Sequence, residues 1–234
     1  MKERIVSAVI LAAGIVVLGL CIKGGIDNFA FKDRKVTVKG LAEREVKADK
    51  VTWPIATKEI GNDLPALYQI INDKQDKIRH FLKANGIKDK EITVGAPKVV
   101  DLNAQEYSNN QSMLYRYNIT SVITVTSSNV DLVRSLISRQ GDLLRQGVAI
   151  VSDDYQYATT YEYTSFKKLK PEMMKQAIEN AEQTAKQFAD NSKSKLNKIV
   201  AADQGQFSIE DRDGNTPFIK KVRVVTTVSY SLKD

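Results

Sequence analysis

The side chains that most often carry acid–base or nucleophilic chemistry are scarce in this chain of 234 residues. It has one histidine, His80, and one cysteine, Cys21, which excludes an intrachain disulfide, a multi-cysteine metal site and a histidine-pair metal site. A catalytic imidazole needs an orienting carboxylate and a nucleophile within hydrogen-bond reach, and the sequence has no G-x-S-x-G motif. We therefore predict that His80 is an exposed or half-buried helix residue, that no residue is catalytic and that the protein is not an enzyme.

Clustered carboxylates are the next chemistry to consider. Asp211-x-Asp213-Gly214-Asn215 resembles the start of a calcium loop, but Thr216 to Ile219 follow without the glutamate that closes an EF-hand. Asp-Gly turn chemistry predicts a polar β-hairpin there instead. Asp153 and Asp154, near Glu162, would bind calcium weakly at most, because strand alternation divides them between two faces. We predict neither a metal site nor a cofactor.

Phosphate and nucleic-acid binding are also disfavoured. The Gly24-Gly25 pair lacks the strand-to-helix context of a phosphate loop. The net charge of +7 arises from basic residues mixed with acidic ones, without an arginine-rich arm or interleaved aromatics. We predict no nucleic-acid partner. Weak attraction of the basic flank Lys32–Lys35 to anionic lipid head groups is the better interpretation of the charge.

Ile5–Ile22 is an uncharged apolar run, preceded by Lys2 and Arg4. As a helix of ~1.5 Å rise per residue it would span ~27 Å, close to the ~30 Å of bilayer hydrocarbon. A cleaved signal peptide and a lipoprotein signal are the alternatives, but no A-x-A site follows and Leu20 precedes Cys21. The sequence favours residues 1–23 as an uncleaved transmembrane anchor.

Charge leaves the orientation of this anchor open. Lys23, Lys32, Arg34 and Lys35 follow the span and outnumber the two basic residues before it. The positive-inside rule would then keep the large domain in the cytoplasm, but long domains translocate with little regard for nearby charge.

Residues 24–35 are expected to form a linker, followed by an α+β domain over residues 36–234. Asn62 or Asp63 would cap a helix with Pro65 in its first turn, and Asn85-Gly86 would end it. Ser128 or Asn129 would cap a second helix. Trp53-Pro54 suggests a bulge or an edge position. Strands are expected over 36–40, 46–59, 92–102, 115–126, 148–163, 198–209 and 220–232, and the longest helix over 171–191.

The sequence suggests an internal repeat that relates about 46–128 to about 148–234, and the alternative is a chance alignment of two amphipathic helices. Each half is predicted to be a strand–helix–strand–strand unit, forming largely antiparallel sheets covered by helices. At constant offset, six residues recur without gaps: Gln69, Ile71, Phe81, Ile92, Arg116 and Thr120 correspond to Gln176, Ile178, Phe188, Ile199, Arg223 and Thr227.

Tyrosines mark the candidate contact surfaces. Tyrosine combines apolar ring area with a hydroxyl that tolerates water, which suits an oligomer interface. An ordinary strand with its tyrosines divided between solvent and core is the alternative for the run from Tyr155 to Tyr163. That run comprises Tyr155, Tyr157, Tyr161 and Tyr163.

The order of motifs resembles that of the SIMPL-domain family, which was formerly called a domain of unknown function. Members of this family include a periplasmic immunogenic protein. The matching residues are short, common motifs in a shared order, and they cover roughly Val36 to Leu232. They are Val36, Val38, Gly40, Glu43, Val46, Ala48 and Asp49; Asn85-Gly86-Ile87 and Glu91-Ile92-Thr93; Tyr107 and Tyr115-Arg116-Tyr117; Val122 to Thr126 and Asp131-Leu132; and Ala177, Ala181, Ala185 and Ala189.

Two positions depart from the family pattern. Ala48 stands where the family usually has proline, and Asn191-Ser192-Lys193 replaces a glycine-containing helix end. The resemblance implies an α+β fold, an envelope location and a tendency to form oligomers, and it brings no catalytic residues. It places the domain on the periplasmic side of the inner membrane, as a single-pass protein.

Two functions follow from these expectations. The first is a non-enzymatic, membrane-anchored envelope protein that self-associates as a scaffold or stress-related binding module, with other envelope proteins as further partners. The second is a periplasmic small-molecule or lipid-binding protein that uses a cleft between the two repeat units. The candidate contacts for that cleft are Arg116, Arg223, Tyr107, Tyr115 and Tyr117.

Overall fold

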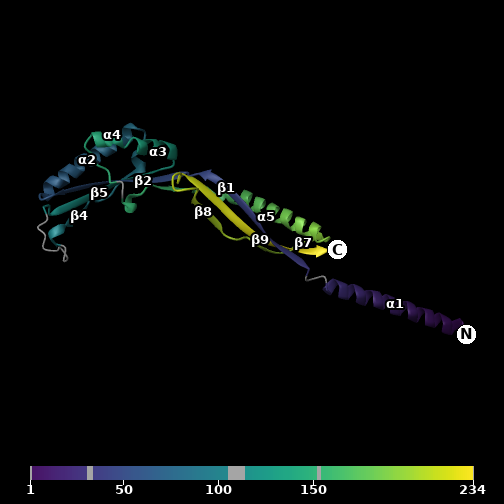
Figure 1. Ribbon diagram of the computed structural model, residues 1–234. Helices are drawn as coiled ribbons and strands as arrows, with labels where there is room; N and C mark the ends of the chain where they lie inside the picture. Colours follow the sequence, from purple (N-terminus) through teal and green to yellow (C-terminus); the bar gives the residue numbers. More distant parts are fainter. Residues whose placement is uncertain (1, 31–33, 105–113, 152–153, 234) are drawn as a thin grey trace. The chain divides into compact units, whose positions relative to one another are not determined.

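The computed structural model describes residues 2–30, 34–104, 114–151 and 154–233, and within the first helix it describes the side chains of residues 11–26. The helices are α1 (Lys2–Ala30), α2 (Leu64–Ala84), α3 (Val130–Ser138), α4 (Gly141–Arg145) and α5 (Phe166–Asn191), with short 3₁₀ turns η2 (Asp89–Glu91), η3 (Leu102–Ala104) and η4 (Tyr155–Tyr157). The strands are β1 (Lys35–Lys47), β2 (Lys50–Gly61), β3 (Ile92–Val94), β4 (Lys98–Asp101), β5 (Tyr117–Ser127), β6 (Thr160–Glu162), β7 (Lys195–Asp203), β8 (Phe207–Asp211) and β9 (Ile219–Lys233) (Figure 1).

The chain forms two compact units, which are described separately. Unit 1 comprises Met1–Arg44, Lys167–Ser208 and Val222–Asp234. Unit 2 comprises Glu45–Phe166 and Ile209–Lys221. The predicted α+β class is confirmed, with two antiparallel sheets and packed helices. The repeat boundaries stay a prediction.

Unit 2 is built on a long antiparallel pair. β2 and β5 pair from Val51↔Ser127 to Gly61↔Tyr117, and the five-stranded sheet has the order β3-β5-β2-β6, with β4 also on β5. Alternate residues of β2, such as Val51, Trp53 and Ile55, are buried. Because side chains alternate across a strand, this pattern gives the sheet one apolar face. The helices α2, α3 and α4 lie on one side of this sheet (Figure 1).

The caps predicted for α2 are confirmed. The Asp63 carboxylate accepts a hydrogen bond from the Ala66 backbone N–H at 3.1 Å, and Pro65 lies in the first turn. Asn85 ends the helix, and Gly86 follows with φ 93°, a left-handed conformation that glycine adopts without steric cost. The helix buries one stripe of apolar side chains at helical spacing: Leu67, Ile71, Ile78, Phe81 and Leu82.

The predicted cap of α3 is also confirmed, and the residue is Asn129. Its side chain accepts from the Leu132 backbone N–H at 3.2 Å. α3 then buries Val130, Val133 and Leu136 in the same core as Trp53. The caps therefore fix where both helices begin, and their buried apolar side chains hold them in the core of unit 2.

Unit 1 packs α5 against a four-stranded sheet of order β1-β9-β7, in which β8 also pairs with β9. α5 runs along these strands (Figure 1). Its buried residues recur every four positions and are mostly alanines: Leu169, Met173, Ala177, Ala181, Ala185 and Ala189. A Cβ on Gly40 of β1 would lie 1.9 Å from the Ala177 carbonyl oxygen. Small residues on both elements thus permit a close approach of helix and strand.

Several predicted boundaries are wrong. Of the described residues in the strand expected over 148–163, Thr160–Glu162 alone form a strand, and Tyr155–Tyr157 form the 3₁₀ turn η4. The strand expected over 198–209 is two strands, separated by a turn at Gly205 (φ 64°). α5 begins at Phe166, so Pro171 lies inside it. Leu169, which precedes Pro171, is buried, and tertiary packing of this kind can override the preference of proline for a helix start.

Trp53-Pro54 is resolved as an edge feature without a bulge. The pairing of β2 with β5 is continuous through Pro54↔Thr124, whereas β6 pairs only with Lys50 to Thr52. Pro54 therefore lies beyond the end of β6, where its missing N–H costs no ladder bond to that strand.

The first element differs from the expected organisation in one respect. α1 continues to Ala30, past the Gly24-Gly25 pair at which a linker was expected to begin. In the described part of the chain, no helix combines the length and the apolar character that crossing a membrane requires.

Candidate functional site

Arg116, the first predicted binding arginine, is engaged in a surface ion pair. It lies just before β5, and its guanidinium donates to the Asp101 carboxylate at 2.9 Å (Nη2) and 3.1 Å (Nε). These hydrogen bonds lower the pKa of Asp101. The guanidinium also lies 4.9 Å from the Tyr117 ring. The backbone N–H of Arg116 donates to the Asn62 side chain. Arg116 therefore ties the end of β4 to β5.

Arg223, the second predicted arginine, lies in β9 of unit 1. Its Nε is 3.4 Å from a carboxylate oxygen of Glu43 in β1, and the side chain is exposed. Arg116 belongs to unit 2. The cleft predicted to bring the two arginines together therefore stays a prediction.

Tyr117 and Tyr161, from the two predicted groups of tyrosines, lie far apart on the sheet of unit 2. Tyr117 pairs with Gly61 and Tyr161 pairs with Val51, which puts them at opposite ends of β2. Ten residues of strand separate these ends by about 33 Å. Tyr115 is exposed near Tyr117, and Tyr107 lies outside the described residues.

The expected ladder from Tyr155 to Tyr163 is wrong, because most of this segment is not a strand. Tyr155 is 98% exposed in η4. Tyr157 lies 5.8 Å from the ammonium of Lys58, which also pairs with Asp154 at 3.4 Å. Tyr163 is half-buried after β6. His80 is exposed on α2, as predicted.

A cation and two aromatic rings meet in unit 2 around Arg134 and Phe218. Neither residue was a candidate site residue in the sequence. The Arg134 guanidinium carbon of α3 lies 3.3 Å from the centre of the Phe218 ring. Tyr161 meets the same ring edge-on, with centres 6.2 Å apart and planes at 69°. The Phe218 carbonyl accepts from the Ala48 backbone N–H at 2.8 Å. The ring is therefore fixed by a strand, a helix and a turn.

These residues line a groove of about 730 Å³ between α3, Tyr161 and residues 214–218. We name it the Arg134 groove. Ser135 and Ser138 of α3 lie along it. Burial raises the pKa of Tyr161, although the nearby Arg134 charge acts in the opposite direction, so its phenol is neutral. The groove thus combines one cation, hydroxyl groups and two aromatic rings.

The turn that carries Phe218 is rigidly built. The Asp213 carboxylate accepts backbone hydrogen bonds from Asn215 at 2.9 Å and Thr216 at 2.8 Å. Hydrogen bonds from the Thr216 hydroxyl and from Arg212 lower its pKa to about 2. This is the Asp-Gly turn predicted from the sequence, and it joins β8 to β9.

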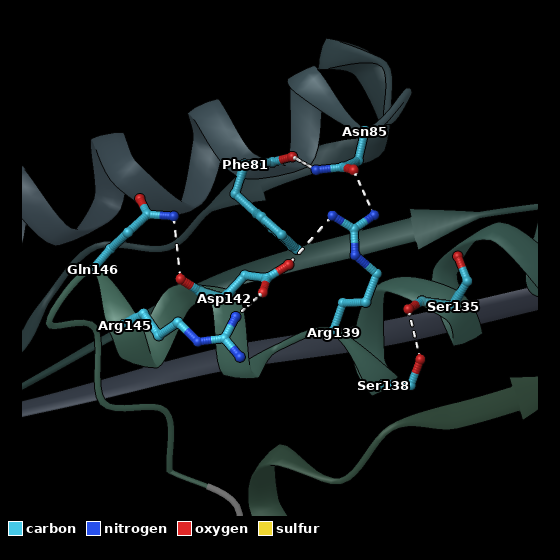
Figure 2. A network of polar contacts seen from close by, with 8 residues as sticks. All are labelled: Phe81, Asn85, Ser135, Ser138, Arg139, Asp142, Arg145 and Gln146. Atoms are coloured by element: carbon cyan, nitrogen blue, oxygen red, sulfur yellow. Dashed lines mark hydrogen bonds and ion pairs between the residues drawn. The ribbon is translucent and has the colours of Figure 1, made fainter.

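Beside the groove, a polar network joins the ends of three helices (Figure 2). Arg139 donates to Asn85 at 2.9 Å and to Asp142 at 3.3 Å. Asp142 also accepts from Arg145 at 2.7 Å, and Asn85 donates to the Phe81 carbonyl at 2.7 Å. These bonds satisfy polar groups where α2 ends and α4 begins. The network therefore connects the end of α3 to both neighbouring helices.

Among the partly buried carboxylates described, Asp49 has a strongly lowered pKa. Burial alone would raise its pKa, but hydrogen bonds from Ser165 and Thr164 outweigh burial and lower it to about 2. The backbone N–H groups of Thr164 and Ser165 donate at 2.6 and 2.8 Å. This aspartate therefore fastens the β1–β2 turn to the segment before α5, which is a structural role.

A metal site needs several ligating side chains close together. Among the residues that the structure describes, no group of three or more histidine, cysteine, aspartate or glutamate side chains is placed to hold a metal ion. The groove residues that belong to patterns noted in the sequence come from three separate segments: Asp131, Tyr161, and Gly214 with Asn215. Arg134 and Phe218 lie 84 positions apart with no shared pattern, so only the fold reveals their contact.

Two antiparallel sheets with packed helices define an α+β domain. The SIMPL family profile, described as a protein of unknown function (DUF541), matches residues 36–230. The chain belongs to the SIMPL family. A search of curated proteins finds no match.

Proposed function

We propose that the protein is a non-enzymatic scaffold of the cell envelope, anchored in the inner membrane by its N-terminal helix, with its SIMPL domain in the periplasm. The domain associates with further copies of itself through the free edge of the unit 1 sheet. The observation that carries the proposal is the exposed apolar edge strand β7.

The case for an anchor rests on the surface of α1. Every described side chain of this helix, residues 11–26, is exposed, including large apolar ones such as Leu11 (68%), Ile15 (62%) and Leu20 (65%). A helix that is apolar all round is stable only when lipid or protein covers it. The uncharged run Ile5–Ile22 has the length that lipid would cover.

The case for association rests on β7. This strand pairs with β9 alone among the described strands, so its other edge has free backbone N–H and C=O groups. It also exposes Ile199 (53%) and Val200 (55%). Exposed edges with apolar side chains are ready to pair with another chain. Anchoring in a membrane raises the local concentration of copies, so weak contacts suffice.

Native mass measurement of the full chain in lipid nanodiscs, with cross-linking in membranes, tests this function. We expect oligomers from the wild type and monomers from the double variant Ile199→Lys, Val200→Lys. Ile60→Lys, which places a charge at a residue 54% exposed in unit 2, is the matched control and should leave the oligomers intact. Wild-type monomers in both measurements, or release of the protein from membranes by alkaline carbonate, would contradict the proposal.

A further inference from the structure

We propose that the Arg134 groove of unit 2 is a binding site for a carboxylate attached to an apolar body. This site is separate from the β7 edge and from the cleft predicted around Arg116. Three features carry the inference: the free donors of Arg134, the charge of its surroundings, and the fixed aromatic floor.

Arg134 is held in place but is left with unused donors. A guanidinium has five N–H groups. Among the described residues, Arg134 has Asp131 as its hydrogen-bond partner. The distance from Nη1 to the Asp131 carboxylate is 3.5 Å, at the outer limit of a hydrogen bond. Phe218 covers one face of the Arg134 guanidinium, and the remaining N–H donors lie around its edge. The side chain is 37% exposed, so a ligand can reach this edge.

The surrounding charge favours a singly charged anion. Asp131 lies within 3.5 Å of Arg134 and 3.9 Å of Lys47, so this set of three groups has one net positive charge. One carboxylate neutralises that charge, whereas a doubly charged phosphate would exceed it beside Asp131. The planar guanidinium also matches a carboxylate in two parallel hydrogen bonds.

The floor of the groove suits an apolar body. The Phe218 and Tyr161 rings pack against the main core of unit 2, so they do not have to be ordered when a ligand binds. A groove of about 730 Å³ has the size of a small-molecule site.

The serines add a polar element on the α3 side. Ser135 donates its hydroxyl to the Leu132 carbonyl at 2.7 Å. Ser138 donates to the Ser135 carbonyl at 2.8 Å (Figure 2). Their oxygens therefore keep lone pairs that accept from a ligand N–H or O–H group. An N-acylated amino acid has such a donor beside its carboxylate, and so has the C-terminal residue of a peptide.

Isothermal titration of the full chain in nanodiscs, with N-acetyl-L-phenylalanine and its amide as probes, tests the site. We expect the acid to bind at least about 10-fold more tightly than the amide, because the amide lacks the charge that pairs with Arg134. Arg134→Gln should abolish this preference, and Arg134→Lys should reduce it. The matched control is Arg145→Gln, which removes the same charge from an exposed arginine of α4 and should bind like the wild type.

A second pair of probes identifies the source of the carboxylate. A hexapeptide ending in phenylalanine is compared with its C-terminally amidated form. Tight binding of the peptide acid alone assigns the groove to protein C-termini, and comparable binding of both acids assigns it to small carboxylates. Equal binding of acids and amides, no binding by the wild type at millimolar concentration, or an Arg134→Gln variant that binds normally would each overturn the proposal. Thermal unfolding of each variant shows that its fold is retained.

Discussion

Units 1 and 2 both pack a long helix on an antiparallel sheet, but they fill the space between helix and sheet in opposite ways. In unit 1 the α5 face is a row of alanines set against Gly40. In unit 2 the α2 face is built from isoleucine, leucine and phenylalanine side chains, set against Trp53 and Ile55. The same architecture is thus stabilised by close backbone approach in one unit and by large buried side chains in the other.

This difference determines which changes each unit tolerates. Where backbones nearly touch, an added carbon has no space, and removing one exposes little apolar surface. Where large side chains fill the core, removing carbons leaves a cavity. Unit 1 should therefore be most sensitive to small-to-large substitutions and unit 2 to large-to-small ones.

The largest effect is expected from Gly40→Ala in unit 1. The new Cβ would lie 1.9 Å from the Ala177 carbonyl oxygen and 2.8 Å from the Ala181 Cβ, so α5 must move away from β1. We expect a loss of about 3 kcal/mol. Hydrogen exchange should show amide protection in α5 reduced on the order of 100-fold.

Gly141→Ala is the control for this substitution. No atom lies within 4 Å of the position that its Cβ would take, at the first residue of α4. Its free energy of unfolding should stay within about 0.5 kcal/mol of the wild type. If the two glycine variants have the same stability, unit 1 is not held by close backbone approach.

Ile55→Ala should be the most damaging simple truncation in unit 2. Ile55 of β2 is fully buried in the main core of unit 2, so its truncation leaves a cavity and should cost about 3 kcal/mol. Trp53 is the only tryptophan of the chain and lies in the same core, so its fluorescence during urea unfolding reports on unit 2.

Two comparisons sharpen this result. Ala185→Gly in α5 should cost only about 1 kcal/mol, since it removes one methyl group and adds backbone freedom. Ile60→Ala, in β2 but 54% exposed, should cost less than about 0.5 kcal/mol. An Ile55→Ala variant as stable as Ile60→Ala would contradict the description of the unit 2 core.

The elements with strong local signals were predictable from the sequence. Asp63, Asn85-Gly86 and Asn129 terminate helices through bonds between residues at most four positions apart, so their pattern is visible without the fold. The alternation of β2 and β5 is equally local. The family resemblance, now supported over residues 36–230, rests on the order of such segments.

What could not be predicted depends on contacts between distant segments. Tyr155 to Tyr163 alternate like a strand, but only Thr160–Glu162 pair with β2, and Tyr155–Tyr157 form a 3₁₀ turn. Likewise, only the pairing register shows that Tyr117 and Tyr161 share β2 as a neighbour yet lie at its two ends. The stacking of Arg134 on Phe218 requires knowledge of where the β8–β9 turn meets α3.

The smallest expected effect concerns Asp49, and it separates the units by pH. Its pKa is about 2 in the folded protein, below the ordinary value of 3.8, because Ser165 and Thr164 donate to the ionised form despite the opposing effect of burial. Such a group stabilises the fold above pH ~3.8 and loses this contribution as the pH falls toward 2. The shift corresponds to roughly 2 kcal/mol, which solvent screening reduces to about 1 kcal/mol. Asp49→Asn should therefore destabilise unit 2 by about 1 kcal/mol at pH 7, and the difference from the wild type should shrink between pH 4 and pH 2.

Trp53 fluorescence in urea, measured at several pH values, gives this difference for unit 2. The control is Asp76→Asn, which removes the same charge from an exposed position of α2 and should follow the wild type throughout. Hydrogen exchange in α5 residues after Lys167, which belong to unit 1, should respond less than the Trp53 signal if the Asp49 bonds act mainly within unit 2. A difference between Asp49→Asn and wild type that stays constant from pH 7 to pH 2 would show that the Asp49 carboxylate does not stabilise the turn through its charge.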